Sequence, residues 1–321
     1  MIIIFALAAC GEVLLKDSEV TDKSIEELGG PIGGGWSMAA SSSAWNPRYK
    51  FALTQMGSRF YLIGGQTTGS YQDVYASENL IQWQKLASST ALGYRSGSCA
   101  VTFNDRIWLL GGFSDDRTSD VWQSENGIDW NLIDASADWS PRSSHSCLVY
   151  DNRIWVFGGW DGTDYLNDVW NTIDGVTWIQ VTPSADWNSR MTEAAVFHDK
   201  MVLVGGYNET QEWLSDVWSS SDGVTWNLDN LTATSSGEVG HSLIVFQDKL
   251  WLLSGNGGTG AYKRQVWNSS DGVTWEKQPT PAWSGRMNGG AGVIGNQLFY
   301  FGGMEKNKAT WLNDVWVYTP R

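Results

Sequence analysis

The sequence is poor in positive charge relative to negative charge. Its 21 Lys and Arg are outnumbered by 35 Asp and Glu, which leaves a net charge of -14. Such a surface disfavours extended contact with nucleic acid phosphates, so we expect no nucleic acid partner. Only 17% of the residues are charged, whereas 21 Trp, 36 Gly and 7 Pro give a composition typical of short strands and tight turns. We therefore expect an all-β protein.

The apolar stretch at the N-terminus is too short to span a bilayer. Residues 1–10 end in Leu7-Ala8-Ala9-Cys10, which resembles the lipobox of bacterial lipoproteins. The resemblance implies that the peptide before Cys10 is removed and that Cys10 carries lipid. No Lys or Arg precedes Cys10, so the charged segment of such a signal is missing. A true start upstream of Met1 would account for this, and the alternative is a buried apolar N-terminus with an incidental cysteine.

Residues 11–31 carry mixed charges and no repeat, so we expect a flexible tether. Together the two segments predict an exported protein that is lipid-anchored in the bacterial cell envelope, either periplasmic or at the outer membrane or cell surface. Membrane association would occur only through the anchor at Cys10.

A glycine doublet recurs every 47 to 49 residues and divides residues 32–321 into six units. The doublets are Gly64-Gly65, Gly111-Gly112, Gly158-Gly159, Gly205-Gly206 and Gly302-Gly303, with Ser254-Gly255 in the fifth unit. A unit of this length is one supersecondary element that buries its apolar face only against its neighbours. We expect one large domain rather than two ordinary ones.

Each unit contains four short strand patterns. In the second unit, apolar runs flank Asn104-Asp105, and two further runs flank Asn126-Gly127. We interpret both pairs as hairpins, and the Asn-Gly and Asp-Gly dipeptides of the second hairpins predict type I′ turns. Four-stranded antiparallel sheets repeated radially predict a six-bladed β-propeller. The last unit lacks a fourth strand, so the segment around Trp36 is expected to complete that blade and close the ring.

The pattern of the units resembles the repeat of the kelch family. It consists of a glycine doublet, then Asn-Asp-Val-Trp, and then a second Trp further along the unit. Asn167-Asp168-Val169-Trp170 and Asn313-Asp314-Val315-Trp316 carry the resemblance, which covers residues 32–321. It implies the propeller type of the galactose oxidase central domain. The cysteine–tyrosine cross-link and paired histidines of that enzyme's copper centre cannot be placed in this sequence.

Most tryptophans are assigned to packing between blades rather than to a carbohydrate site. They are expected in the second, third and fourth strands. The set assigned to fourth strands is Trp36, Trp83, Trp130, Trp178, Trp226 and Trp275.

The few histidines and the two remaining cysteines suggest neither a metal site nor a cross-link. His145 and His241 fall at equivalent positions of their units, while His198 lies in a turn on the opposite face, so the three cannot converge on a metal. We expect no metal and no cofactor. Cys99 and Cys147 lie in consecutive units, whose strands rarely approach within bridging distance, so two buried thiols are expected rather than a disulfide.

Candidate binding residues lie on the face that carries the second-to-third and fourth-to-first connections. The resemblance to kelch propellers implies that sites lie on this face around the central channel. The residue after each doublet varies between units: Gln66, Phe113, Trp160, Tyr207, Asn256 and Met304. Phe113, Trp160 and Tyr207 are expected to line one arc of the opening and to stack on sugar rings or on apolar side chains of a partner. The alternative for each is packing against the next blade.

An arginine recurs in the fourth-to-first connections, as Arg48, Arg95, Arg142, Arg190 and Arg286. It either bonds loop carbonyls or forms a cationic collar that selects carboxylate ligands. In the fifth unit Glu238 takes this place, Gln265 replaces an Asp, and residues 257–264 form an expanded loop. An acid among Arg190, Arg286, Lys263 and Arg264 would stay ionised, which makes Glu238 the one candidate catalytic base. Ordinary ion pairing would give the same sequence.

We therefore expect a non-catalytic propeller that binds a protein or a glycan through its loop-bearing face outside the cytoplasm. The candidate ligand-binding residues are Phe113, Trp160, Tyr207, Asn256, Arg95, Arg142, Arg190, Arg286 and Glu238. One alternative is an enzyme that acts on acidic sugars, similar to a kelch-type sialic acid epimerase. A second alternative is an envelope scaffold, which predicts no small-molecule pocket.

Overall fold

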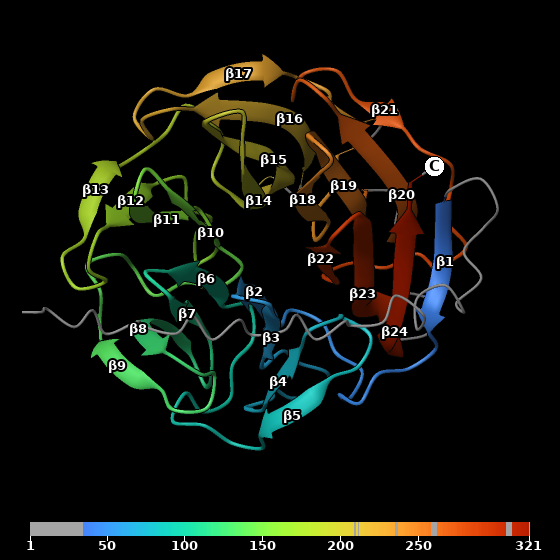
Figure 1. Ribbon diagram of the computed structural model, residues 1–321. Helices are drawn as coiled ribbons and strands as arrows, with labels where there is room; N and C mark the ends of the chain where they lie inside the picture. Colours follow the sequence, from blue (N-terminus) through green and yellow to red (C-terminus); the bar gives the residue numbers. More distant parts are fainter. Residues whose placement is uncertain are drawn as a thin grey trace, which may run out of the picture.

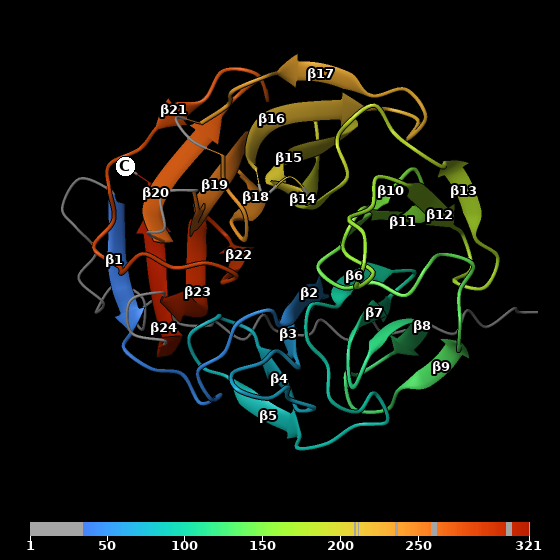
Figure 2. The ribbon, with the colours of Figure 1, turned by 180° about the vertical axis from the view of Figure 1, so that it is seen from behind.

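The computed structural model describes residues 35–320 apart from residues 209, 211, 235–236, 258–261 and 306–309. In this part of the chain, six four-stranded antiparallel sheets surround a central axis like the blades of a propeller (Figures 1 and 2). The all-β, six-bladed prediction is confirmed. The described residues contain no helix with the length and hydrophobicity needed to cross a membrane. Cys10 and the expected tether, residues 11–31, lie outside the described residues.

The blades follow one another along the chain, and within each blade the strands are ordered from the axis outward (Figure 1). Blade 1 consists of β2 (Ala52–Met56), β3 (Arg59–Ile63), β4 (Val74–Ser77) and β5 (Gln84–Ala87). Blade 2 consists of β6 (Cys99–Phe103), β7 (Arg106–Phe113), β8 (Arg117–Ser124) and β9 (Asn131–Asp134). Blade 3 consists of β10 (Ser146–Tyr150), β11 (Arg153–Phe157), β12 (Val169–Thr172) and β13 (Ile179–Thr182).

The second half of the ring repeats this arrangement. Blade 4 consists of β14 (Arg190–Phe197), β15 (Lys200–Asn208), β16 (Trp213–Ser220) and β17 (Asn227–Asn230). Blade 5 consists of β18 (Ser242–Phe246), β19 (Lys249–Asn256), β20 (Tyr262–Ser269) and β21 (Glu276–Lys277). Blade 6 consists of β22 (Gly290–Ile294), β23 (Gln297–Glu305), β24 (Thr310–Thr319) and, from the other end of the chain, β1 (Gly35–Ala40).

The N-terminal strand closes the ring, as the sequence predicts. Strand β1 pairs antiparallel with β24, and Trp36 lies opposite Tyr318. The first and last strands therefore share one sheet (Figure 1). Closure covers the outer edge of β24, and it makes the stability of blade 6 depend on both ends of the chain.

The hydrophobic core is divided into six clusters, and each cluster lies between two neighbouring blades. Between blades 3 and 4, for example, Trp155 and Phe157 of β11 pack with Met201 and Leu203 of β15. Neither blade can bury these side chains alone, so the blades stabilise one another in pairs.

The outer hairpins differ from the prediction in two details. The tryptophans assigned to fourth strands lie, apart from Trp36, in the turn just before those strands. There the indole N–H donates to the backbone of the turn, as where Trp226 Nε1 donates to the Gly223 carbonyl at 3.1 Å.

The turn of the second hairpin is also not of type I′, because Gly223 has a positive φ of 74° but Asp222 does not. Asp222 Oδ1 instead accepts the backbone N–H groups of Val224 and Thr225, and this side-chain bonding replaces the second positive φ. Type I′ geometry occurs in first hairpins, where Asn104 and Asp105 both have positive φ.

The prediction of two free thiols is wrong, because Cys99 and Cys147 form a disulfide. They lie in β6 and β10, the innermost strands of blades 2 and 3, and their Cα atoms are 5.9 Å apart. Blades narrow toward the axis, where the innermost strands come within side-chain reach of one another. The 3.2 Å contact between the Thr54 and Thr102 hydroxyls, from β2 and β6, shows the same approach between blades 1 and 2.

Reduction of this disulfide is expected to destabilise the propeller by about 4 kcal/mol. The bond closes a loop with a sequence separation of 48 residues, and opening it restores that much chain entropy to the unfolded state. Urea unfolding of the protein with and without reductant, and of the Cys99→Ser/Cys147→Ser double variant, measures the change. Equal unfolding free energies for oxidised and reduced protein would contradict the expectation.

Candidate functional site

The recurring arginines are buried in the blades and are not available to a ligand. Each pairs with an aspartate of the third-strand region of the same blade: Arg48 with Asp73, Arg95 with Asp120, Arg142 with Asp168, Arg190 with Asp216, and Arg286 with Asp314. The five guanidinium groups belong to residues that are at most 6% exposed. The arginines are therefore structural residues that bond within their own blades. They do not form a cationic collar that could select carboxylate ligands.

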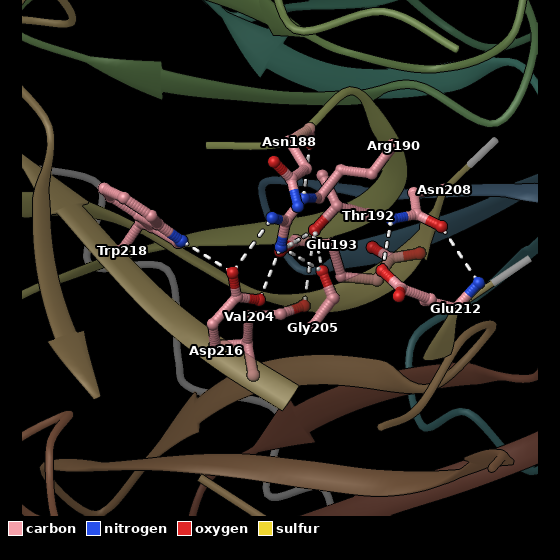
Figure 3. A network of polar contacts seen from close by, with 10 residues as sticks. All are labelled: Asn188, Arg190, Thr192, Glu193, Val204, Gly205, Asn208, Glu212, Asp216 and Trp218. Carbon is pink, nitrogen blue, oxygen red and sulfur yellow. Dashed lines mark hydrogen bonds and ion pairs between the residues drawn. The ribbon is translucent and has the colours of Figure 1, made fainter. Parts of the chain in front are cut away.

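In blades 3, 4 and 6 one set of bonds around the pair explains several repeated residues at once. In blade 4, Arg190 Nη1 and Nη2 contact the two carboxylate oxygens of Asp216 at 2.6 and 2.9 Å (Figure 3). Arg190 also donates to the carbonyl oxygens of Asn188 and Gly205, and Trp218 Nε1 donates to Asp216 at 2.8 Å. The arginine, the doublet, the aspartate and the third-strand tryptophan are thus parts of one polar network.

Blade 5 lacks this ion pair. Glu238 stands where the other blades have arginine, and it is 1% exposed with no hydrogen bond to either carboxylate oxygen. Burial raises the pKa of Glu238 to about 8, although the charges of Lys263 and Lys277 act in the opposite direction. The expectation that Glu238 stays ionised beside Arg190 and Arg286 is therefore wrong. The reason is that those two arginines are already paired with their own aspartates. Residues 258–261 of the expanded loop lie outside the described residues.

The residue after each doublet has the same backbone pairing in every blade, whereas its side chain differs from blade to blade. In every blade its backbone pairs with the residue that follows the recurrent arginine or Glu238. The pairs are Tyr49 with Gln66, Ser96 with Phe113, Ser143 with Trp160, Met191 with Tyr207, Val239 with Asn256, and Met287 with Met304. The backbone pairing determines the path of the chain at this position but not the type of residue. The side chain there can therefore differ between blades and serve in recognition.

The three expected aromatic residues form a continuous arc with neighbours that the sequence did not suggest. The Arg117 guanidinium lies 3.8 Å from the centre of the Trp160 ring and 5.6 Å from that of Phe113. Tyr165 lies between Trp160 and Tyr207, with ring centroids 6.4 and 5.9 Å from theirs. The arc therefore spans blades 2, 3 and 4.

A cavity of about 350 Å³ opens at the axis beside this arc. Tyr207, Asn256 and Trp213 line its wall, whereas Phe113 and Trp160 do not take part in the lining. A second hollow of about 230 Å³ shares lining residues with the first and continues past Cys99 and Cys147. The described residues include no cluster of three or more His, Cys, Asp or Glu side chains that could hold a metal.

One residue from each blade forms an inner ring in the wall of the cavity. These residues each follow the recurrent arginine or Glu238 by three positions: Phe51, Ser98, His145, Glu193, His241 and Gly289. The doublets allow this ring to form, because a side chain at Gly159 would place its Cβ 2.7 Å from the Cβ of His145. Burial lowers the pKa of His145 to about 3, with the charge of Arg142 as a lesser cause, and lowers that of His241 to about 4. Both imidazoles are therefore neutral at pH 7.

Sequence reasoning missed Glu193 as a site residue. Burial raises the pKa of Glu193 to about 7, and its strand lies between those of His145 and His241 in the ring. The sequence could have indicated it, because Glu193 follows Arg190 by three residues, as His145 follows Arg142 and His241 follows Glu238. Glu193 therefore occupies the same position in its unit as the two histidines.

The ring of six blades defines a β-propeller of the Kelch class, since five blades carry a glycine doublet, the fifth carries Ser254-Gly255, and each has a third-strand Asp-Val-Trp or a variant of it. Residues 50–255 match the model of the KLHDC2/KLHL20/DRC7 Kelch-repeats domain. Because the match covers more than half of the chain, the protein belongs to this family of Kelch-repeat domains. A search of curated proteins gave no match. The architecture fits a protein-binding scaffold.

The Glu238→Gln variant is expected to stabilise the protein at alkaline pH and to have little effect in acid. The pKa of Glu238 is raised from 4.5 to about 8, so the wild type loses stability as pH rises through about 8, while an amide does not titrate. The variant should gain roughly 3 to 5 kcal/mol over the wild type at pH 9 relative to pH 4. Urea unfolding at both pH values measures this. Glu276→Gln, an exposed acid on β21, is the control, and the same difference from wild type at both pH values would contradict the expectation.

Proposed function

We propose that this protein is a non-catalytic, exported binding protein that takes a segment of a partner protein on its loop-bearing face. The observation that supports this most directly is the aromatic arc next to an open cavity on a face whose backbone is held by buried ion pairs. Large, partly buried aromatic side chains on a rigid scaffold are the groups that dominate binding energy in protein interfaces.

The surroundings of Trp160 favour a protein over a glycan. Sugar binding uses the open face of an aromatic ring, whereas here the Arg117 guanidinium already lies 3.8 Å from the centre of the Trp160 ring, and the Tyr165 ring stands beside it with the centroids 6.4 Å apart. Tyr207 is likewise in contact with the Trp213 ring, at 5.1 Å between centroids. Such a cluster offers ring edges and polar tips, which suit a peptide segment with apolar side chains.

The two alternatives have less support. Glu238, the base required for an enzyme of the acidic-sugar type, is 1% exposed and does not line the cavity. The guanidinium groups that would bind the sugar carboxylate are occupied by aspartates. An envelope scaffold predicts no small-molecule pocket, and a cavity of about 350 Å³ does not fit that prediction.

The location outside the cytoplasm is supported by the disulfide. Disulfides persist in oxidising compartments such as the periplasm and the cell surface and are rare in the cytosol. The Cys99–Cys147 bond therefore agrees with export, and the lipobox-like sequence before Cys10 supplies a route for both export and anchoring.

Peptide ligands selected from a random library by the full-length protein should depend on the arc. We expect Trp160→Ala and Tyr207→Ala each to weaken their binding by at least about 30-fold, which corresponds to the loss of one dominant interface residue. Fluorescence polarisation measures the affinities. Ile179→Ala, on the exposed outer strand of blade 3, is the control and should bind as the wild type does. Unchanged binding by both arc variants would contradict the proposed site, and selective binding to a glycan panel in place of peptides would replace the protein ligand by a glycan.

Expression in a bacterium with a lipoprotein pathway should give a lipid-modified protein. The full-length chain is expected to incorporate radioactive palmitate, and Cys10→Ser should abolish the label because the acceptor thiol is lost. Cys99→Ser should leave the label unchanged. Equal labelling of wild type and Cys10→Ser, or absence of label from both, would contradict the anchor.

A further inference from the structure

Two buried imidazoles line the cavity. His145 and His241 are 6% and 2% exposed, and none of their ring nitrogens makes a well-formed hydrogen bond; their nearest polar partners are the backbone groups of Leu110 and Glu238. Each buried polar group without a partner costs about 1 to 3 kcal/mol. Because these nitrogens border a cavity that opens at the axis, water or a ligand in the cavity can complete their bonding.

Glu193 lies in the same wall between these histidines and also lacks a partner. Within the described residues, neither a hydrogen bond nor an ion pair reaches its carboxylate. Its own strand offers no cation, because Arg190 is held by Asp216, and the residue opposite Glu193 on β15 is Val204. The neighbouring innermost strands present only the two neutral imidazoles. The carboxyl is half-buried in the cavity wall, so its ionised form is less well solvated than in bulk water and would be favoured by a cation supplied from outside.

We propose that the cavity is a subsite for an organic cation, above all a guanidinium group such as an arginine side chain of the bound segment, with Glu193 as its counter-ion and His145 and His241 as neutral hydrogen-bond acceptors. This rests on the proposed function, since it names the chemical group by which the partner enters the cavity.

The shape and chemistry of the cavity match such a group. In the part of the chain that the structure describes, His145, Glu193 and His241 are not close enough together to hold a metal ion. A ligand that contacts all three must therefore be larger than a single ion. A guanidinium distributes five N–H donors around a plane and can reach a carboxylate and two flanking acceptors. Phe51, Tyr207 and Trp213 of the wall supply apolar surface for the aliphatic stem of the cation.

The remaining charged group of the cavity is Lys50, and it lies across the axis from Glu193. Lys50 precedes blade 1, whereas Glu193 belongs to blade 4, so the two stand on opposite sides of the six-membered ring. Burial first and the charge of Arg117 second lower the pKa of Lys50, which weakens its repulsion of a cation. The subsite for the cation therefore lies at blade 4, on the other side of the ring from the backbone of Lys50.

The counter-ion role makes binding depend on pH in a defined direction. The pKa of Glu193 is about 7 in the empty protein, so roughly nine-tenths of the molecules hold a proton there at pH 6 and roughly one-tenth do at pH 8. A cation binds the ionised form and displaces the proton. Affinity should therefore rise about tenfold from pH 6 to pH 8 and change little above that. The histidines titrate well below this range and do not contribute.

The test is calorimetric titration of the full-length protein with Nα-acetyl-L-arginine amide, with the neutral isostere Nα-acetyl-L-citrulline amide as the ligand control. The arginine compound should bind at pH 8 at least about tenfold more tightly than the citrulline compound, and about tenfold more tightly than at pH 6. Glu193→Gln should abolish both differences. Glu276→Gln, which removes an exposed acid on β21, should preserve them. The comparison of the two ligands and the two pH values on the wild type stands even if Glu193→Gln fails to fold.

The outcomes separate this inference from the proposed function. Equal affinity for the two compounds, or an arginine preference that survives in folded Glu193→Gln, would overturn the cation subsite. Library peptides that bind through Tyr207 without any preference for arginine would overturn the subsite and leave the proposed function standing. Binding of the arginine compound with the predicted pH dependence, in a protein that selects no peptide, would support the subsite and overturn the protein-binding function.

Discussion

The buried arginine–aspartate pair is the interaction on which the rest of the structure depends. It connects the loop that enters a blade to the third strand of the same blade, and through the Arg190 bond to the Gly205 carbonyl it also holds the doublet between them. A buried ion pair offers little net stability over an apolar substitute, but the loss of one partner leaves an uncompensated charge and costs about 3 to 5 kcal/mol. The pair therefore acts as a strong constraint on loop position. In five of the six blades it holds the loops of the face on which the cavity and the arc lie.

The fifth blade shows which features depend on the ion pair and which do not. Glu238 and Gln265 cannot form it, yet the backbone pairing of Val239 with Asn256 matches that of the other blades. Trp267 still donates its indole N–H, now to the Gln265 side chain at 3.2 Å. The blade geometry is thus maintained by the β-ladder and by packing against blades 4 and 6. What changes is the electrostatic balance, because an unpartnered buried carboxyl replaces a neutral pair.

Those parts of the structure that repeat within one unit were predictable from the sequence, and those that arise between units were not. The spacing of the doublets predicts the number of blades, and the missing fourth strand of the last unit predicts closure through Trp36, because both follow from local patterns. The Cys99–Cys147 disulfide and the inner ring depend on how closely innermost strands approach at the axis, which no single unit encodes. Glu193 looks like an ordinary polar residue in an alternating strand, and only its position relative to Arg190 places it in the cavity.

Some positions carry similar residues in nearly every blade and others differ from blade to blade, and this difference follows from where the side chains lie. The arginine network and the six interblade clusters use residues whose environment is the same in nearly every blade, so these residues are tied to stability. The inner-ring positions line the cavity at the axis, and the ring accommodates residues as different as Phe51, Glu193 and Gly289. Exchanging Glu193 alters the charge and shape of the cavity without breaking an ion pair of its blade, whereas exchanging Phe51 would also disturb the cluster between blades 6 and 1. The axis is therefore where a propeller of this kind can acquire a specific ligand at the least cost to its stability, and an unpaired acid between two neutral imidazoles gives this cavity an affinity for cations.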